Sequence, residues 1–254
     1  MRRIRVIPAL LLKEGGLVKT KKFKEPVYVG DPINALRIFN EKEVDELALL
    51  DITKDRHQRP MDIQVVQDIV SEAFMPMAFG GGISTLQRIE QLLKAGVEKV
   101  ILNSIIPQGE QLIQEASQQF GAQSVVASLD VRKTMLRGYG CYGQNGTERW
   151  KADLMTWVKR CEEWGVGEIM LNAVDRDGTY GGYDLGLIQQ VSAAVDIPVI
   201  ASCGASTLAD FKKAREHGAS AVSAGSMFVF QRPNQAVLIQ YPSQDSLERE
   251  VFSE

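Results

Sequence analysis

The sequence predicts a single eight-stranded β/α barrel made of two similar halves, and three observations support that fold class. The chain has 254 residues, and such barrels typically have about 250. Short β-rich runs alternate with amphipathic stretches of helical length, which is the pattern of β/α units around a parallel sheet. Equivalent features also recur in the two halves at one fixed offset. We therefore expect a (β/α)8 TIM barrel rather than two small domains.

Strands and helices are expected to follow one another along most of the chain. The predicted strands start at Arg5, Glu46, Met75, Lys99, Ser124, Glu168, Pro198 and Ala219. The predicted helices between them span residues 33–40, 63–73, 86–95, 109–120, 154–164, 185–194 and 208–217. This order predicts a parallel sheet with its helices on the outside.

The internal repeat has an offset of 122 positions. The pairs that share this offset are Glu46 and Glu168, Gly82 and Gly204, Gly96 and Gly218, and Ser104 and Ser226. Repeats of this kind indicate that one structural unit occurs twice. We expect one domain over residues 1–254, with half-barrels at about 1–120 and 121–230 and a divergent C-terminal segment at 231–254.

The composition narrows the classes of partner. The chain is 44% hydrophobic and 24% charged, with a net charge of −3, so nucleic acid and acidic membranes are not expected as partners. Cys141, Cys161 and Cys203 lack metal-ligand spacing and are typical of a reducing compartment. With no cleavable leader and no apolar run of membrane length, a cytoplasmic protein is expected. We expect no metal and no cofactor.

Glycine-rich loops follow several predicted strands and suit the binding of phosphate groups. The first half offers Gly80, Gly81 and Gly82 after strand three, then Asn103 and Ser104 after strand four. The second half offers Gly204 after strand seven, Gly225 and Ser226 after strand eight, and the turn Asp177, Gly178 and Thr179 after strand six. Backbone N–H groups free of side chains, at the start of a helix, bind anions. The glycines could instead only form tight turns, but matched loops on the functional face favour two phosphate cradles.

Several motifs together resemble the cyclase subunit of imidazole glycerol phosphate synthase over roughly residues 5–230. They are Arg5, Lys99, the run 80–82, Asp130, and the run 175–179 followed by Gly182, Tyr183 and Asp184. The resemblance implies a barrel that binds a phosphorylated small molecule with a phosphate at each end. It also implies a heterodimer with a glutaminase subunit on the lower face, ammonia passing through the barrel, and a role in histidine biosynthesis.

The resemblance also implies two aspartates that exchange protons at the upper ends of strands one and five. Asp130 matches the second aspartate, whereas Leu11 occupies the position of the first. A leucine cannot exchange protons, and losing one acid or base removes about 10² to 10⁴ in rate. Normal cyclase activity is therefore not expected. Two alternatives stay open: Glu14 could replace the missing acid, and Asp130 could merely cap a loop or pair with Arg132.

Four charged residues are predicted to meet inside the lower mouth of the barrel. Side-chain alternation along the strands places Arg5, Glu46, Lys99 and Glu168 there, with no net charge. A ring of salt bridges that plugs the barrel is one interpretation. In the resembling family the four matching residues form the gate through which ammonia enters. Because buried charges are costly unless paired, we favour a gate.

Two segments are less regular. Lys19, Lys21, Lys22 and Lys24 lie in a long loop after strand one, with Gly15 and Gly16 as a hinge, and could close over an anionic substrate or simply be solvated. Lys19 matches a loop position of the family. The apolar run at 236–241 favours a strand where the family has a charged eighth helix, so closure of the outer helical ring is not expected.

The sequence keeps both phosphate cradles and the four gate residues but lacks one of the two catalytic aspartates. In this combination it resembles a divergent branch of the family that is found with surface-polysaccharide (lipopolysaccharide) genes. In that branch the barrel pairs with a glutaminase, and a separate sugar amidotransferase uses the ammonia. Our leading hypothesis is this role. The alternatives are a working cyclase and a scaffold that only binds and activates the glutaminase.

Overall fold

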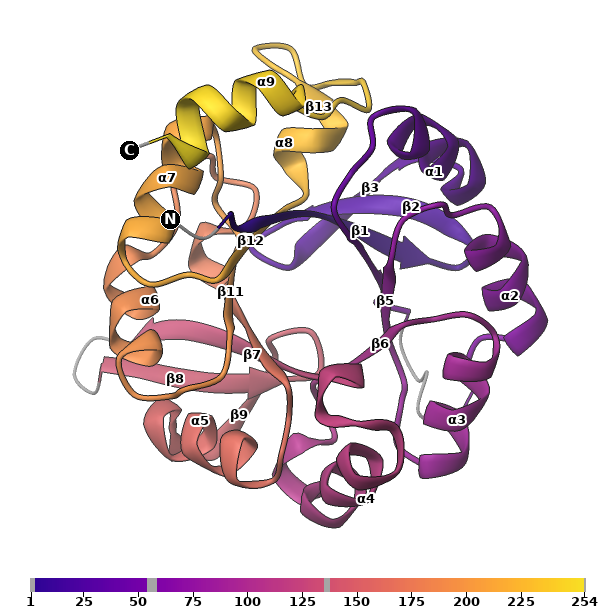
Figure 1. Cartoon of the computed structure of the whole chain (residues 1–254), viewed down its shortest axis with the longest axis vertical. Coiled ribbons are helices and arrows are strands. Elements are labelled where there is room, and N and C mark those ends of the chain that lie inside the picture. The colour runs from indigo at the N-terminus through magenta and orange to yellow at the C-terminus, as the bar shows by residue number, and fades with distance from the viewer. Residues whose placement is uncertain (1–2, 54–58, 135–137, 254) are drawn as a thin grey trace.

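The computed structural model describes residues 3–53, 59–134 and 138–253, and in these residues eight parallel strands close into a barrel (Figure 1). They are β1 (Arg5–Lys13), β4 (Leu47–Asp51), β5 (Met77–Gly80), β6 (Lys99–Leu102), β7 (Val125–Thr134), β10 (Glu168–Ala173), β11 (Val199–Ser202) and β12 (Ala221–Ala224). Each pairs with its neighbours in parallel, and pairing of β12 with β1 closes the ring. The predicted fold class is confirmed, and each strand starts within two residues of its predicted position.

Seven helices surround the barrel as expected. They are α1 (Pro32–Glu41), α2 (Ile63–Ser71), α3 (Leu86–Lys94), α4 (Glu110–Phe120), α5 (Leu154–Glu163), α6 (Leu185–Ser192) and α7 (Leu208–Glu216). Short 3₁₀ turns lie at η1 (Ile106–Gln108), η2 (Ala122–Ser124) and η3 (Val174–Arg176). Most of the helices begin where an aspartate or threonine side chain accepts a backbone N–H, as Asp31, Thr85 and Asp184 do. Among the described helices, none is both long and apolar enough to span a bilayer.

The barrel has two apolar layers. One fills the space between the strands and the outer helices and includes Phe39, Phe79 and Phe211. The other lies inside the barrel and consists of Ile7, Ala48, Ala78, Ile101, Val126, Met170, Ile200 and Ala221, with Leu50 packed against it. Three of these eight inner residues are alanines, whereas bulky branched side chains dominate most barrel interiors. The inner layer is mixed, with alanines on β4, β5 and β12 and larger aliphatic side chains on the other strands.

Two β-hairpins rise from the barrel where only loops are expected from the sequence. The first extends β1 through β2 (Gly16–Lys21) and β3 (Lys24–Gly30), and the second extends β7 through β8 (Gly138–Gly143) and β9 (Glu148–Asp153). The expected lysine loop is thus a strand pair whose turn holds Lys22 and Phe23 at φ of 54° and 62°. Gly16 pairs with Lys13 in the ladder, and Gly15 lies in the turn between β1 and β2 at a φ of 87°.

The C-terminal segment completes the outer ring. After α8 (Ser226–Val229) come β13 (Phe230–Gln231) and β14 (Ala236–Val237), then α9 (Gln244–Leu247) and a π-helical turn η4 (Glu248–Phe252). Only two residues of the apolar run form a strand. The final turns lie beside α7 and the N-terminus (Figure 1), where Arg215 donates to the Phe252 carbonyl at 3.1 Å and Arg3 stacks on the Phe252 ring. The expectation of an unclosed ring was therefore wrong.

Candidate functional site

The upper mouth of the barrel, at the carboxyl ends of its strands, contains two adjoining cavities. The larger has a volume of about 520 Å³ and the smaller about 60 Å³. Leu11, Phe23, Leu50 and Asn172 line both, so they form the boundary between them. Ligand sites of β/α barrels lie at this face. The two predicted cradles fall one in each cavity.

The first cradle lies in the larger cavity, lined by Gly80, Gly81, Gly82, Asn103 and Ser104. Gly81 has a φ of +131°, and a Cβ there would lie 2.6 Å from the Asp51 carbonyl oxygen. No other residue fits at that position without moving β4. Asn103 donates to the Ser128 carbonyl at 2.8 Å, and the Ser104 hydroxyl accepts the Gln144 N–H at 3.0 Å. The loop is thus held open by contacts on both sides.

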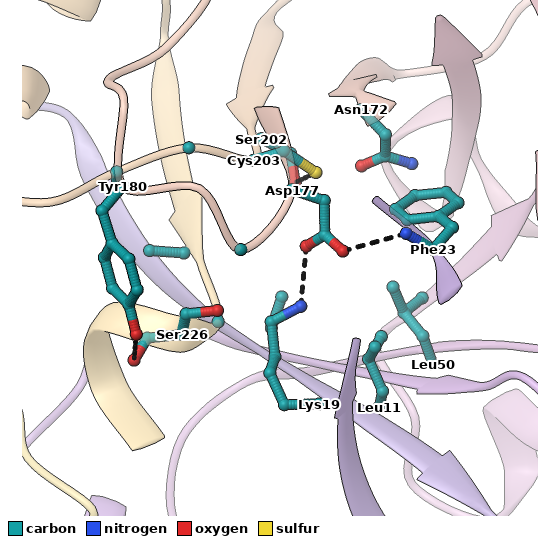
Figure 2. Close-up of a pocket in the computed structure, with 16 residues that line it drawn as sticks. Leu11, Lys19, Phe23, Leu50, Asn172, Asp177, Tyr180, Ser202, Cys203 and Ser226 are labelled. Carbon is teal, nitrogen blue, oxygen red and sulfur yellow. Dashed lines mark hydrogen bonds and ion pairs between the residues drawn. The ribbon is translucent and has the colours of Figure 1, made fainter. Parts of the chain in front are cut away.

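The second cradle lies in the smaller cavity, shown in Figure 2, and is lined by Gly178, Gly204, Gly225 and Ser226. Gly204 has a φ of +103°, and a Cβ there would lie 2.4 Å from the Gly182 carbonyl oxygen. The sequence prediction is less accurate at Thr179. Its hydroxyl donates to the Arg176 carbonyl at 2.8 Å, and the residue does not line either cavity. Three loops from separate strands nevertheless converge here.

Lys19 and Asp177 join the first hairpin to the second cradle. The Lys19 ammonium lies 2.7 Å from one Asp177 oxygen, and both side chains are buried (Figure 2). The other oxygen accepts the Thr20 hydroxyl at 2.8 Å and the Phe23 N–H at 3.2 Å. Lys19 is thus not solvated, and it lines the smaller cavity while it is paired with Asp177. It fastens the hairpin across the barrel mouth and places Phe23 between the cavities.

Asp130 ends the barrel portion of β7 and points into the larger cavity. Burial raises the pKa of its carboxyl group to about 7, although the Asn172 amide donates to it at 2.9 Å and opposes the rise. Arg132 forms its ion pair with Asp175, 3.2 Å away, and its charge only partly offsets the rise in the Asp130 pKa. A carboxyl group with a pKa near neutrality suits acid/base chemistry.

Leu11 is on the cavity side of β1, between the two cradles. Its side chain lies beside Leu50 in Figure 2, and the two residues pair in the β1–β4 ladder. Glu14 does not take over this place. It is exposed in the turn after β1, with a φ of 51°, and it lines neither cavity. Position 11 thus presents hydrocarbon to both cavities.

Asp51 is a site residue that the sequence analysis missed. It is buried at the end of β4, lines the larger cavity, and accepts the Thr53 N–H at 2.9 Å. The signal for it is an aspartate directly after the apolar run 47–50, at the upper end of a predicted strand. Gln144, Asn145 and Thr147 also line this cavity, from the unpredicted turn between β8 and β9. The larger cavity thus contains two carboxyl groups.

The four predicted charges meet at the lower mouth. Arg5 forms ion pairs with Glu46 and, at 2.8 Å, with Glu168. Lys99 binds the same two carboxylates, with nitrogen–oxygen distances of 2.9 Å to Glu46 and 3.3 Å to Glu168. Burial lowers the Arg5 pKa, but the two carboxylates outweigh it and leave that pKa raised. Each cation therefore bridges both anions, and the ring is closed.

Comparison with known proteins agrees with this geometry. Residues 5–233 match the family described as "Histidine biosynthesis protein". A Pseudomonas aeruginosa protein named "Putative imidazole glycerol phosphate synthase subunit hisF2" is 49% identical, covering 98% of this chain and 99% of the relative. A Vibrio vulnificus protein named "Putative imidazole glycerol phosphate synthase subunit hisF3" is 44% identical, covering 96% of this chain and 94% of the relative. "Imidazole glycerol phosphate synthase subunit HisF" of Corynebacterium glutamicum is 39% identical, covering 90% and 91%.

Proposed function

The chain belongs to the family of the HisF subunits of imidazole glycerol phosphate synthase, and we propose that it conducts ammonia for a reaction other than cyclisation. It pairs with a glutaminase subunit on its lower face and receives the ammonia there. The ammonia is then passed on for amidation of a surface-polysaccharide sugar by a separate amidotransferase. The observation that carries the proposal is Leu11, which turns a branched hydrocarbon toward both cavities.

The ring at the lower mouth supports a role in ammonia entry. Four charges in contact have a large desolvation cost that an apolar plug of the same volume would avoid. Arg5 keeps the most exposed side chain of the four, at 30%, whereas the others are at 15% or less. If one cation moved away, both carboxylates would still be paired with the remaining cation. The ring can therefore open without leaving a buried carboxylate unpaired. Three of the eight inner residues above the ring are alanines, so the side chains that ammonia would pass are small on that side of the barrel.

The relatives support a role distinct from histidine biosynthesis. Two proteins whose names carry the numbers 2 and 3 are 49% and 44% identical to the chain, against 39% to 42% for unnumbered HisF subunits. A number in the name of a subunit is expected where one organism has a second copy of that subunit with a specialised role. The two cradles then either hold a different phosphorylated molecule or persist from the common ancestor.

Transfer of labelled nitrogen tests this proposal. The purified chain is combined with a glutaminase subunit, a sugar amidotransferase, ATP, the sugar substrate and glutamine labelled with ¹⁵N in its amide. We expect ¹⁵N in the sugar amide and faster glutamine hydrolysis than by the glutaminase alone. Hydrolysis that is not accelerated, or accelerated hydrolysis without sugar labelling, would contradict the proposal.

A working cyclase is the second candidate, and Asp51 is the observation that favours it. Asp51 and Asp130 both line the larger cavity, so two carboxyl groups are available there for proton transfer. Ammonia-dependent cyclase turnover, measured with ammonium salt and no glutaminase, separates the two functions. We expect no turnover by the natural chain and a gain with Leu11→Asp, but none with the non-ionising control Leu11→Asn. Turnover by the natural chain that Asp51→Asn abolishes would instead establish the cyclase.

A further inference from the structure

A third cavity, of about 270 Å³, lies outside the barrel where the C-terminal segment folds back beside α8. Leu208 of α7, Met227 of α8 and Phe230 of β13 supply its apolar wall. The Gln240 amide donates to the carbonyls of Met227 and Phe230, at 3.1 Å and 3.4 Å, and so fixes that wall. The only described residue that this cavity shares with the cavities of the barrel mouth is Tyr180.

Arg232 gives this cavity its charge. Its guanidinium lies over the Tyr180 ring, 4.7 Å from the centroid, and donates to the Ser206 carbonyl at 3.3 Å. No carboxylate is found among the described residues that line the cavity. A guanidinium presents a planar fork of donors that matches a carboxylate or phosphate. The cation is thus exposed, positioned by these two contacts, and not neutralised by any described residue that lines the cavity.

We infer that this cavity binds a small anion with an aromatic or branched aliphatic body. Its carboxylate or phosphate contacts Arg232, and its body packs against Met227 and Phe230. Concave sites with apolar walls and one well-placed charged group are typical of small-molecule binding. The inference does not depend on the proposed function, because no residue of the ring, Asp130 or Leu11 takes part in it.

Tyr180 connects this site to the second cradle. The Arg232 guanidinium stacks on one face of the Tyr180 ring. The Tyr180 hydroxyl lies 3.5 Å from the Ser226 carbonyl oxygen (Figure 2). A ligand that draws Arg232 away from the ring therefore acts on a side chain that lines the second cradle. Occupancy of the outer cavity would change the affinity of that cradle for phosphate, and the reverse would hold by the same factor.

Methyl NMR of the full chain tests the site directly. The probes are 2-naphthoate, 2-naphthyl phosphate and neutral 2-naphthol, which differ only in the group that would meet Arg232. Titrations are followed at the Met227 methyl, one of eight methionine methyls in the chain, with inorganic phosphate present to occupy the cradles. We expect saturable shifts at Met227 with one or both anions and none with naphthol at the same concentrations.

Two variants locate the binding. Arg232→Gln should weaken anion binding about tenfold or more, since hydrogen bonds to charged groups are stronger than neutral ones. Arg160→Gln is the matched control. Arg160 also stacks on an aromatic ring, 5.1 Å from the centroid of Trp157, but it lies on α5, away from the cavity. Leu208→Trp should fill the cavity and abolish the shifts at Met227, with thermal unfolding confirming that the variant folds. The inference would be overturned if no anion gave saturable shifts at Met227, or if Arg232→Gln bound the anions with the same affinity as the natural chain.

Discussion

Leu11 and Asp130 show how one side chain alters the chemistry available to another. Asp130 is buried beside Asn172 and faces a cavity whose inner wall includes Leu11 and Leu50. An ionised carboxylate loses hydration in such surroundings, which is why its pKa rises to about 7. At neutral pH the group is therefore divided between its acid and base forms. With a leucine as neighbour it has no ionisable partner at position 11 with which to exchange a proton.

The raised pKa predicts a specific pH dependence of stability. The folded state binds the Asp130 proton more tightly than the unfolded chain, so this contribution to stability is complete below about pH 4. It is lost as the pH rises to about 7. A rise in pKa from 3.8 to about 7 corresponds to a few kcal/mol, on the order of 4. Asp130→Asn should lack this loss.

The measurement is urea unfolding of the natural chain and Asp130→Asn at intervals between pH 4 and pH 8. The stability of the variant relative to the natural chain should rise over this range and level off above pH 7. Asp68→Asn, on the exposed face of α2, is the control and should follow the natural chain. A constant difference between the natural chain and Asp130→Asn would contradict a buried carboxyl group with a raised pKa.

At the scale of elements, Asp177 fastens the hairpin of β2 and β3 through a buried ion pair with Lys19 and hydrogen bonds from Thr20 and Phe23. Replacing Lys19 by Met leaves Asp177 buried without a cation, and breaking a buried pair in this way is strongly destabilising. We expect backbone amide exchange over residues 16–30 to speed up at least about tenfold. The exposed Lys21→Met, on the same strand, should have little effect. Similar exchange in both variants would show that the pair does not hold the hairpin.

The elements also show which features a single sequence reveals. Each barrel strand and outer helix has its own hydrophobic period, so all fifteen could be predicted locally. The two hairpins could not, because their strands are partly polar and their stability comes from pairing with β1 and β7. The partner of Lys19 could not be predicted from spacing either, since Asp177 is 158 positions away.

The candidate site was predictable to a similar extent. Glycines and short polar residues at strand ends indicated both cradles, because the fold alone carries those positions to one face. Thr179 was wrongly included since the path of its turn directs the hydroxyl to its own backbone. Asp51 was missed because it follows a strand without glycine or any other loop signal, and only burial and the cavity distinguish it.

At the scale of the whole molecule, the C-terminal segment ties the end of the chain to the first strand. The Tyr241 hydroxyl donates to the Val6 carbonyl at 3.1 Å, next to Arg5 of the charged ring, and the Tyr241 ring packs on Phe228. Tyr241→Phe should lower the free energy of unfolding by about 1 kcal/mol, the typical value of one such hydrogen bond. Tyr28→Phe, at an exposed tyrosine of β3, is the control for urea unfolding. Equal effects of the two changes would rule out a role for this tie.

The ring and the cradles lie at opposite ends of one barrel, with an apolar layer that includes three alanines between them. Conduction of ammonia makes use of both ends, whereas a scaffold that only activates a glutaminase requires the lower face alone. The two roles differ in what happens to the nitrogen after glutamine is hydrolysed. Lys99 distinguishes them because it contacts both carboxylates of the ring.

The most direct test compares Lys99→Met with Lys94→Met in the ¹⁵N transfer reaction. Lys94 is an exposed lysine near the end of α3 and serves as the control. We predict that Lys99→Met lowers the fraction of hydrolysed amide nitrogen that reaches the sugar, while Lys94→Met leaves that fraction unchanged. If both variants transfer the same fraction as the natural chain, ammonia does not pass through the ring, and the proposed function is wrong.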